Sequence, residues 1–177
     1  MKIREFFVVL TVFFMFFWMS GLVEAAGMPL KFPAFSTKDL DGRAVTDSIF
    51  AENEITMINF WATWCPPCVA EMPDLGELAK TLLEDSDRKD ALIGILLDAD
   101  DRGALEKARQ ILSKSGAGFP ILRPSSEMQS IIGAIDAIPT TIFVDSEGNI
   151  VGSAVIGARS SQAYLQAISA AWKEAYE

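Results

Sequence analysis

The stretch ITMINFWATWCPPC, residues 55–68, decides the fold of this chain. Its first part, 55–62, is a continuous apolar run rich in β-branched and aromatic residues, which predicts a strand buried on both faces of a sheet. The cysteines that follow open a helix, which we expect to reach about Leu83 because apolar residues recur at helical spacing. Pro66 and Pro67 fall in the first turn of that helix, where proline is tolerated.

Weaker patterns on both sides of this unit complete the predicted fold. Asp41-Gly42 predicts the turn of a hairpin that begins near Phe35 and ends near Val45. The later segments predict a strand at 91–97, a helix at 100–115, an apolar piece at 119–122, a short helix at 127–132, paired strands at 140–144 and 150–156, and a last helix capped by Ser160 or Ser161. Strands that alternate with helices and end in a hairpin and a helix predict an α/β domain, with a central mixed sheet flanked by helices.

The amino terminus predicts export from the cytoplasm. Lys2 and Arg4 precede an 18-residue apolar run at 6–23, and small residues follow it, which is typical of a signal peptide cleaved near Ala25. The alternative is an uncleaved membrane tether, because 18 residues is the lower limit for crossing a bilayer. Either reading of residues 1–25 places the rest of the chain in the periplasm or on the outer face of the cytoplasmic membrane.

Composition excludes several classes of function. The chain has 177 residues, two cysteines, no histidine and a net charge of −9. Without histidine there is no Ser-His-Asp or Cys-His catalysis, and two cysteines cannot complete a zinc site. We therefore expect neither a metal nor a cofactor. The acidic balance argues against nucleic acid as a partner.

The C-x-x-C motif carries the chemistry. Cys65 and Cys68 are spaced for a disulfide at a helix start. There the free N–H groups and the positive end of the helix dipole favour a thiolate on Cys65, which we expect to be the more accessible thiol. Cys68, one turn inward, would resolve a mixed disulfide by attacking Cys65. The alternatives are an inert structural disulfide, which would constrain the unfolded chain little, and haem attachment, which lacks the required histidine at Val69.

These residues carry a resemblance to a family. FWATWCPPC at 60–68, with Glu71-Met72-Pro73 after it and Ile138-Pro139-Thr140-Thr141 further on, resembles the TlpA/ResA type of thioredoxin-like protein. The resemblance implies that residues 26–177 form one thioredoxin-like domain with an N-terminal β-hairpin. It also implies a central strand-helix insertion near 97–122, and the activity of an exported or membrane-tethered thiol–disulfide oxidoreductase.

The resemblance further implies which residues form the site. Pro139 matches the family's cis-proline, which lies beside the cysteines and lets the backbone at Ile138 pair with a substrate chain. Glu71 matches a glutamate that affects the acidity of the cysteines, the alternative being a solvated surface carboxylate. Trp64, with Pro66 and Pro67, is expected to flank the site and contact substrate.

Two further positions separate this chain from thioredoxin itself. Asn59 stands where cytoplasmic thioredoxins have a buried acid, so any proton role falls to Glu71 or to water. Trp61 is expected in the core rather than at the site.

Four functions are compatible with these residues. The leading hypothesis is a reductase of disulfides in exported proteins such as apocytochromes c, kept reduced by a membrane thiol–disulfide electron donor, since outside the cytoplasm disulfides persist unless they are reduced. The same chemistry in reverse would make an oxidase or isomerase. A thiol peroxidase-like antioxidant protein is the third hypothesis, and a redox-inert binding module or copper chaperone is the fourth.

Overall fold

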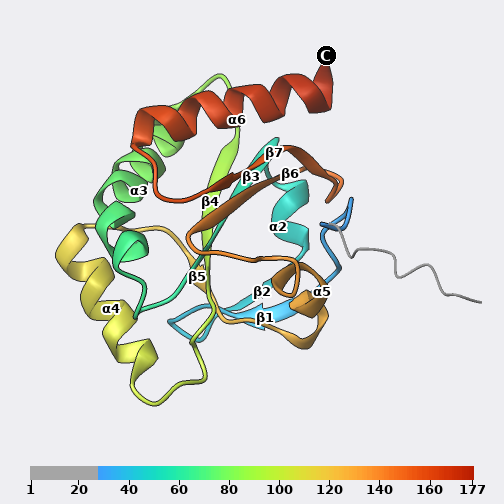
Figure 1. Cartoon of the computed structure of the whole chain (residues 1–177). Helices are drawn as coiled ribbons and strands as arrows, with labels where there is room; N and C mark the ends of the chain where they lie inside the picture. Colours follow the sequence, from blue (N-terminus) through green and yellow to red (C-terminus); the bar gives the residue numbers. More distant parts are fainter. Residues whose placement is uncertain (1–27) are drawn as a thin grey trace, which may run out of the picture.

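The computed structural model describes residues 28–177 (Figure 1). The predicted signal peptide or tether at 1–25 lies outside the described residues. In chain order the elements are β1 (Ser36–Lys38), β2 (Ala44–Thr46), α2 (Ser48–Ala51), β3 (Ile55–Trp61), α3 (Pro66–Glu84), β4 (Asp90–Leu96), α4 (Ala104–Ser115), β5 (Ile121–Leu122), the 3₁₀ helix η1 (Ser126–Met128), α5 (Gln129–Ile132), β6 (Thr140–Asp145), β7 (Ile150–Ile156) and α6 (Ser161–Tyr176).

A mixed five-stranded sheet forms the centre of the domain, as predicted. Its strand order is β5-β4-β3-β6-β7, with β3 parallel to β4 and antiparallel to β6. Every residue of β3 is buried, because helices or loops cover both faces of this central strand. The predicted N-terminal hairpin forms a separate two-stranded sheet of β1 and β2.

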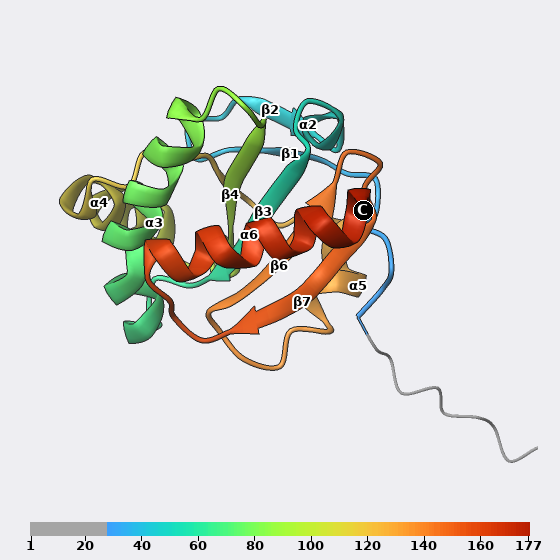
Figure 2. The ribbon, with the colours of Figure 1, turned by 90° about the horizontal axis from the view of Figure 1, so that it is seen from above.

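The two faces of the sheet carry different layers. Helices α3 and α6 cover one face, and α6 lies across β7, β6 and β3 (Figure 2). The N-terminal hairpin, α2 and α5 lie on the other face, where the rings of Phe32, Phe35 and Phe50 pack edge to face. Since side chains alternate along a strand, Met57, Asn59 and Trp61 share a face, and it is the face beneath α3 and α6.

The structure differs from the sequence prediction at two places. Helix α4 begins at Ala104 instead of residue 100, because the acidic stretch before it forms turns that end at Gly103, whose φ of +78° favours glycine. Within the predicted insertion at 97–122, helix α4 is followed by the short strand β5. The short helix α2 was not predicted. Of the two candidate caps of α6, Ser160 is the one observed, and its side chain accepts the N–H of Ala163.

Within residues 28–177, the structure contains no helix with the length and apolar character needed to cross a bilayer.

Candidate active site

The two cysteines form a disulfide at the first turn of α3. Cys65 is the N-cap residue, and its Sγ accepts the backbone N–H of Cys68 at 3.3 Å. Pro66 and Pro67 occupy the first two helical positions and have no N–H. Cys68 therefore supplies the first N–H of the helix that can reach the Cys65 sulfur.

Exposure differs sharply around the motif. Cys65 is 3% exposed and Cys68 is fully buried, whereas the neighbouring Trp64 is 63% exposed. Trp61 is fully buried, as expected for a core residue. The predicted order of accessibility concerns the reduced thiols and stays a prediction, since the disulfide form buries both sulfur-bearing residues.

The loop before β6 approaches the disulfide. The Ile138–Pro139 peptide bond is cis, as predicted, and the Ile138 carbonyl oxygen lies 3.7 Å from Cys65 Sγ. A disulfide sulfur has no proton to donate, so this is a close contact rather than a hydrogen bond in the oxidised protein. The Pro139 carbonyl accepts the N–H of Gly157 at 2.7 Å, which fastens the loop to the end of β7.

The loop after β4 holds the segment that precedes the cysteines. Asp98 follows β4 and is buried, and its carboxylate accepts the backbone N–H of Thr63 at 3.1 Å. The Thr63 hydroxyl also donates to Asp98 Oδ2 at 2.6 Å. Two hydrogen-bonding groups of the residue two positions before Cys65 are thus held by one carboxylate.

Glu71 is buried in the protein, with 2% of its surface exposed, so the alternative of a solvated surface carboxylate is wrong. Its Oε2 accepts the hydroxyl of Tyr164 at 2.9 Å and the backbone N–H of Arg159 at 3.2 Å. Its Oε1 accepts Nδ2 of Asn59 at 3.0 Å. Glu71 lies three residues after Cys68, and residues at that spacing face the same side of a helix.

Asn59, Thr141 and Tyr164 connect the two oxygens of Glu71 into a closed ring. Nδ2 of Asn59 also donates to Thr141 Oγ1 at 3.1 Å, and that hydroxyl donates to the Tyr164 oxygen at 3.5 Å. All three side chains are fully buried. The ring joins β3, β6, α3 and α6, and its member Thr141 lies two residues after Pro139.

The family model described as Redoxin matches residues 25–167. The chain belongs to the Redoxin family. Among its relatives, thiol-disulfide oxidoreductase ResA of Bacillus thuringiensis (strain Al Hakam) is 31% identical over 142 residues, covering 77% of this chain and 76% of the relative. The thiol:disulfide interchange protein DsbE homolog of Paracoccus denitrificans is 32% identical over 121 residues, covering 67% and 61%.

A solved structure agrees with these relatives. The thioredoxin-family thiol:disulfide interchange protein of Chlorobium tepidum TLS superimposes with a TM-score of 0.65 at 27% identity, covering 82% of this chain and 98% of that one. The resemblance to the TlpA/ResA type is confirmed. This Redoxin-family protein is a thiol–disulfide oxidoreductase with a thioredoxin-like fold.

The Redoxin site contains a carboxyl group that binds protons more readily than a free glutamate. Burial raises the pKa of Glu71, and the donors Tyr164, Asn59 and the Arg159 backbone only partly offset that effect. The charge of Asp74 raises it further. Burial, followed by the charge of Glu71, raises the pKa of Tyr164 far above its usual range, so the phenol stays protonated and remains a donor. Among residues 28–177, no basic side chain forms a salt bridge with Glu71.

The family resemblance identified Glu71 and Pro139, but Tyr164, which bonds Glu71, and Asp98, which bonds Thr63, were missed. Tyr164 carried a usable signal, because it shares the buried face of α6 with Ile168 and a buried tyrosine hydroxyl needs a partner. Asp98 also carried one, since it lies two residues after β4, which is parallel to the strand that leads into the cysteines.

Proposed function

We propose that this thiol–disulfide oxidoreductase works outside the cytoplasm and reduces disulfides in exported proteins. Apocytochromes c before haem attachment are the proposed clients, and a membrane thiol–disulfide donor keeps the cysteine pair reduced. The export pattern at residues 1–25 and the family of the relatives support this proposal. Outside the cytoplasm, disulfides persist unless an enzyme reduces them.

The observation that carries the direction of electron flow is the scarcity of donors at Cys65. Because Pro66 and Pro67 have no N–H, the N–H of Cys68 is the one hydrogen bond to Cys65 Sγ in the described part of the chain. A thiolate with few donors is weakly stabilised, and strong oxidants of this fold owe their high potential to a stabilised reduced form. Weak stabilisation therefore favours a reductant.

The exchange proceeds in two displacements. The Cys65 thiolate attacks one sulfur of the client disulfide, a Cys65–client S–S bond forms, and the other client sulfur leaves as a thiolate. Cys68 then loses its proton to Glu71 or to water and attacks Cys65 Sγ, which forms the Cys65–Cys68 disulfide and releases the second client thiolate. Two electrons pass from the cysteine pair to the client, and both client thiolates take up protons.

The client chain lies against the loop of the cis-proline. The Ile138 backbone, which faces the Cys65 sulfur, pairs with the client in a strand-like manner. The exposed Trp64 and the adjoining Pro66 and Pro67 contact the residues beside the client cysteine.

The reduction potential tests the direction of the reaction. We expect a value below about −200 mV, measured by equilibration with glutathione or dithiothreitol, whereas a value near about −120 mV is that of a strong oxidase. A result near the higher value would contradict the reductase and support the oxidase or isomerase.

Trapping in cells tests the clients. Cys68→Ala should accumulate mixed disulfides on Cys65 with exported proteins that contain cysteine pairs, including apocytochromes c. The matched control Cys65→Ala should accumulate none. Capture of cytoplasmic proteins alone would contradict the proposed location.

A further inference from the structure

The hydrogen bonds to Glu71 are distributed unequally over its two oxygens. Oε2 accepts two donors, the Tyr164 hydroxyl at 2.9 Å and the Arg159 backbone N–H at 3.2 Å. Oε1 accepts one donor, Nδ2 of Asn59 at 3.0 Å. A proton added to Oε2 would displace one of its two donors, whereas Oε1 accepts one hydrogen bond and keeps a lone pair for the proton.

Asn59 has a group ready to receive that proton. Its Oδ1 is buried and has no hydrogen-bond partner in the described part of the chain. A half-turn of the amide would bring Oδ1 to the position of Nδ2, where it can accept a proton carried by Glu71 Oε1.

Tyr164 cannot make the corresponding change. Its oxygen already accepts the Thr141 hydroxyl at 3.5 Å, so its own proton is directed to Glu71 Oε2. Burial keeps the phenol protonated. Asn59 can therefore follow the protonation state of Glu71, and Tyr164 is a fixed donor.

We propose that Tyr164 is a positioning residue that reserves Oε2 of Glu71 as an acceptor, so that the proton Glu71 takes up resides on Oε1 beside Asn59. The link between this proton and disulfide exchange rests on the proposed function, but the position of the proton does not. Tyr164 touches neither sulfur nor client and acts through Glu71.

The surroundings of Glu71 contain few other titrating groups. Helix α3 contributes Asp74 and the cysteine pair, which does not titrate in the oxidised protein. The chain before α6 contributes Arg159, and α6 contributes Tyr164. Strands β3 and β6 contribute the uncharged Asn59 and Thr141. Titration of the oxidised protein therefore isolates Glu71 from the thiols.

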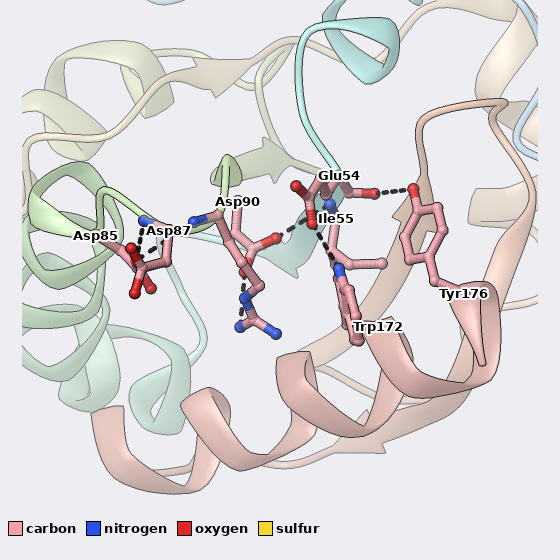
Figure 3. Close-up of polar contacts among 8 residues, drawn as sticks. Glu54, Ile55, Asp85, Asp87, Asp90, Trp172 and Tyr176 are labelled. Atoms are coloured by element: carbon pink, nitrogen blue, oxygen red, sulfur yellow. Dashed lines mark hydrogen bonds and ion pairs between the residues drawn. The ribbon is translucent and has the colours of Figure 1, made fainter.

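The test is a carbon-13 NMR titration of the glutamate carboxyls in the oxidised, full-length protein, with the Glu71 resonance assigned by its loss in Glu71→Gln. Tyr164→Phe removes a donor to the anion, so the Glu71 midpoint should rise by about one pH unit or more. The matched control is Tyr176→Phe, the other tyrosine of the chain, whose hydroxyl donates to the Glu54 carbonyl at the far end of α6 (Figure 3). That control should leave the midpoint unchanged, and an unchanged midpoint in Tyr164→Phe would overturn the proposal.

Infrared difference spectroscopy locates the proton directly. If Oε2 is the carbonyl oxygen of protonated Glu71, its C=O stretch is lowered by two hydrogen bonds and should move to higher frequency in Tyr164→Phe. An unmoved band would mean that the proton resides on Oε2. A loss of packing alone would not shift this band in the expected direction.

A third measurement covers the case in which Tyr164→Phe does not fold. Incorporating 3-fluorotyrosine into Tyr176→Phe labels Tyr164 alone and makes its phenol a stronger donor. The Glu71 midpoint should then fall, and a rise or no change contradicts the proposal. The exchange rate of the reduced protein separates this inference from the proposed function, because a moved NMR midpoint with an unmoved pH profile of exchange would refute only the catalytic role of Glu71.

Discussion

Two buried carboxylates lie at opposite ends of β3. Both have a raised pKa, but they have different roles in the protein. Glu71 contacts Asn59 near the cysteine end, and Asp90 lies beside Ile55 at the start of the strand. Burial raises the pKa of both groups. Asp90, however, forms an ion pair with the Arg88 guanidinium at 2.9 Å, whereas Glu71 is held by uncharged donors.

The partners decide what each carboxylate can do. If Asp90 took up a proton, Arg88, whose side chain is 24% exposed, would lose its counter-charge. If Glu71 takes up a proton, the buried donors around it remain uncharged. Figure 3 shows the Asp90 end, where Trp172 and Tyr176 of α6 both reach Glu54. That end fastens the last helix to the sheet, and the Glu71 end can exchange a proton.

The largest expected difference between the two ends is in reactivity. Cys65→Ala should lower the rate of disulfide exchange by about 10³-fold or more, because it removes the attacking sulfur. Asp90→Asn should exchange at the wild-type rate. The measurement is reduction of a peptide disulfide by the reduced protein. Slow exchange by Asp90→Asn would contradict the claim that the Asp90 end of β3 takes no part in the reaction.

The next effect is on stability at the Asp90 end. Arg88→Gln should lower the free energy of unfolding at pH 7 by about 1.5 kcal/mol, because it leaves the buried Asp90 carboxylate without its charged partner. Arg43→Gln removes the same charge from an exposed ion pair with Asp41 and should change stability by less than about 0.5 kcal/mol. Urea unfolding measures both, and equal losses would show that the ion pair is not specific.

At the Glu71 end, a substitution should raise the free energy of unfolding by a smaller amount. The pKa of Glu71 is raised above its ordinary 4.5, so the stability that this group contributes is full below pH 4.5 and is lost as pH rises through the native pKa. Glu71→Gln stays neutral, so its stability relative to wild type should increase over that window, by about 1.4 kcal/mol for each unit of raised pKa. A pH-independent difference in urea midpoints would remove Glu71 as a proton-binding group.

The smallest effect separates two tryptophans. The indole N–H of Trp172 donates to Glu54, and the Arg88 guanidinium lies 5.7 Å from the centre of the Trp172 ring. Trp172→Phe removes that hydrogen bond and weakens the contact with Arg88. The free energy of unfolding should fall by about 1 kcal/mol, and the rate of disulfide exchange should be unchanged. Trp64→Phe should leave stability unchanged and slow exchange with protein clients, because Trp64 is exposed beside Cys65. If Trp172→Phe slowed exchange and Trp64→Phe lowered stability, the roles assigned to the two tryptophans would be wrong.

Most of the fold was predictable because its patterns are local. The apolar run of β3, the periodicity of α3 and the Asp41-Gly42 turn each occupy adjacent residues, and all three elements form where predicted. The start of α4 could not be predicted from a local pattern. Acidic residues at this point are compatible both with the first turn of a helix and with the turns observed. The Gly103 conformation, which decides between them, is set by the loop as a whole.

The candidate site was predictable as far as its motif extends. Cys65 and Cys68 follow from residue types at fixed spacing, and Pro139 follows from the family resemblance. The hydrogen bond between Glu71 and Tyr164 joins residues 93 positions apart, and that between Thr63 and Asp98 joins residues 35 apart. Such contacts depend on how helices and strands pack against each other, which no local pattern specifies.

The clasp between Asp98 and Thr63 has a consequence for how a client is received. With both the amide and the hydroxyl of Thr63 engaged, the segment entering the cysteine pair is a rigid frame instead of a hinge. Reduction and oxidation of the disulfide then require the sulfur atoms and side chains to move, while the backbone of this segment stays in place. A bound polypeptide must adjust its own shape to that frame, so unfolded or flexible chains should react faster than the same disulfide held in a folded domain.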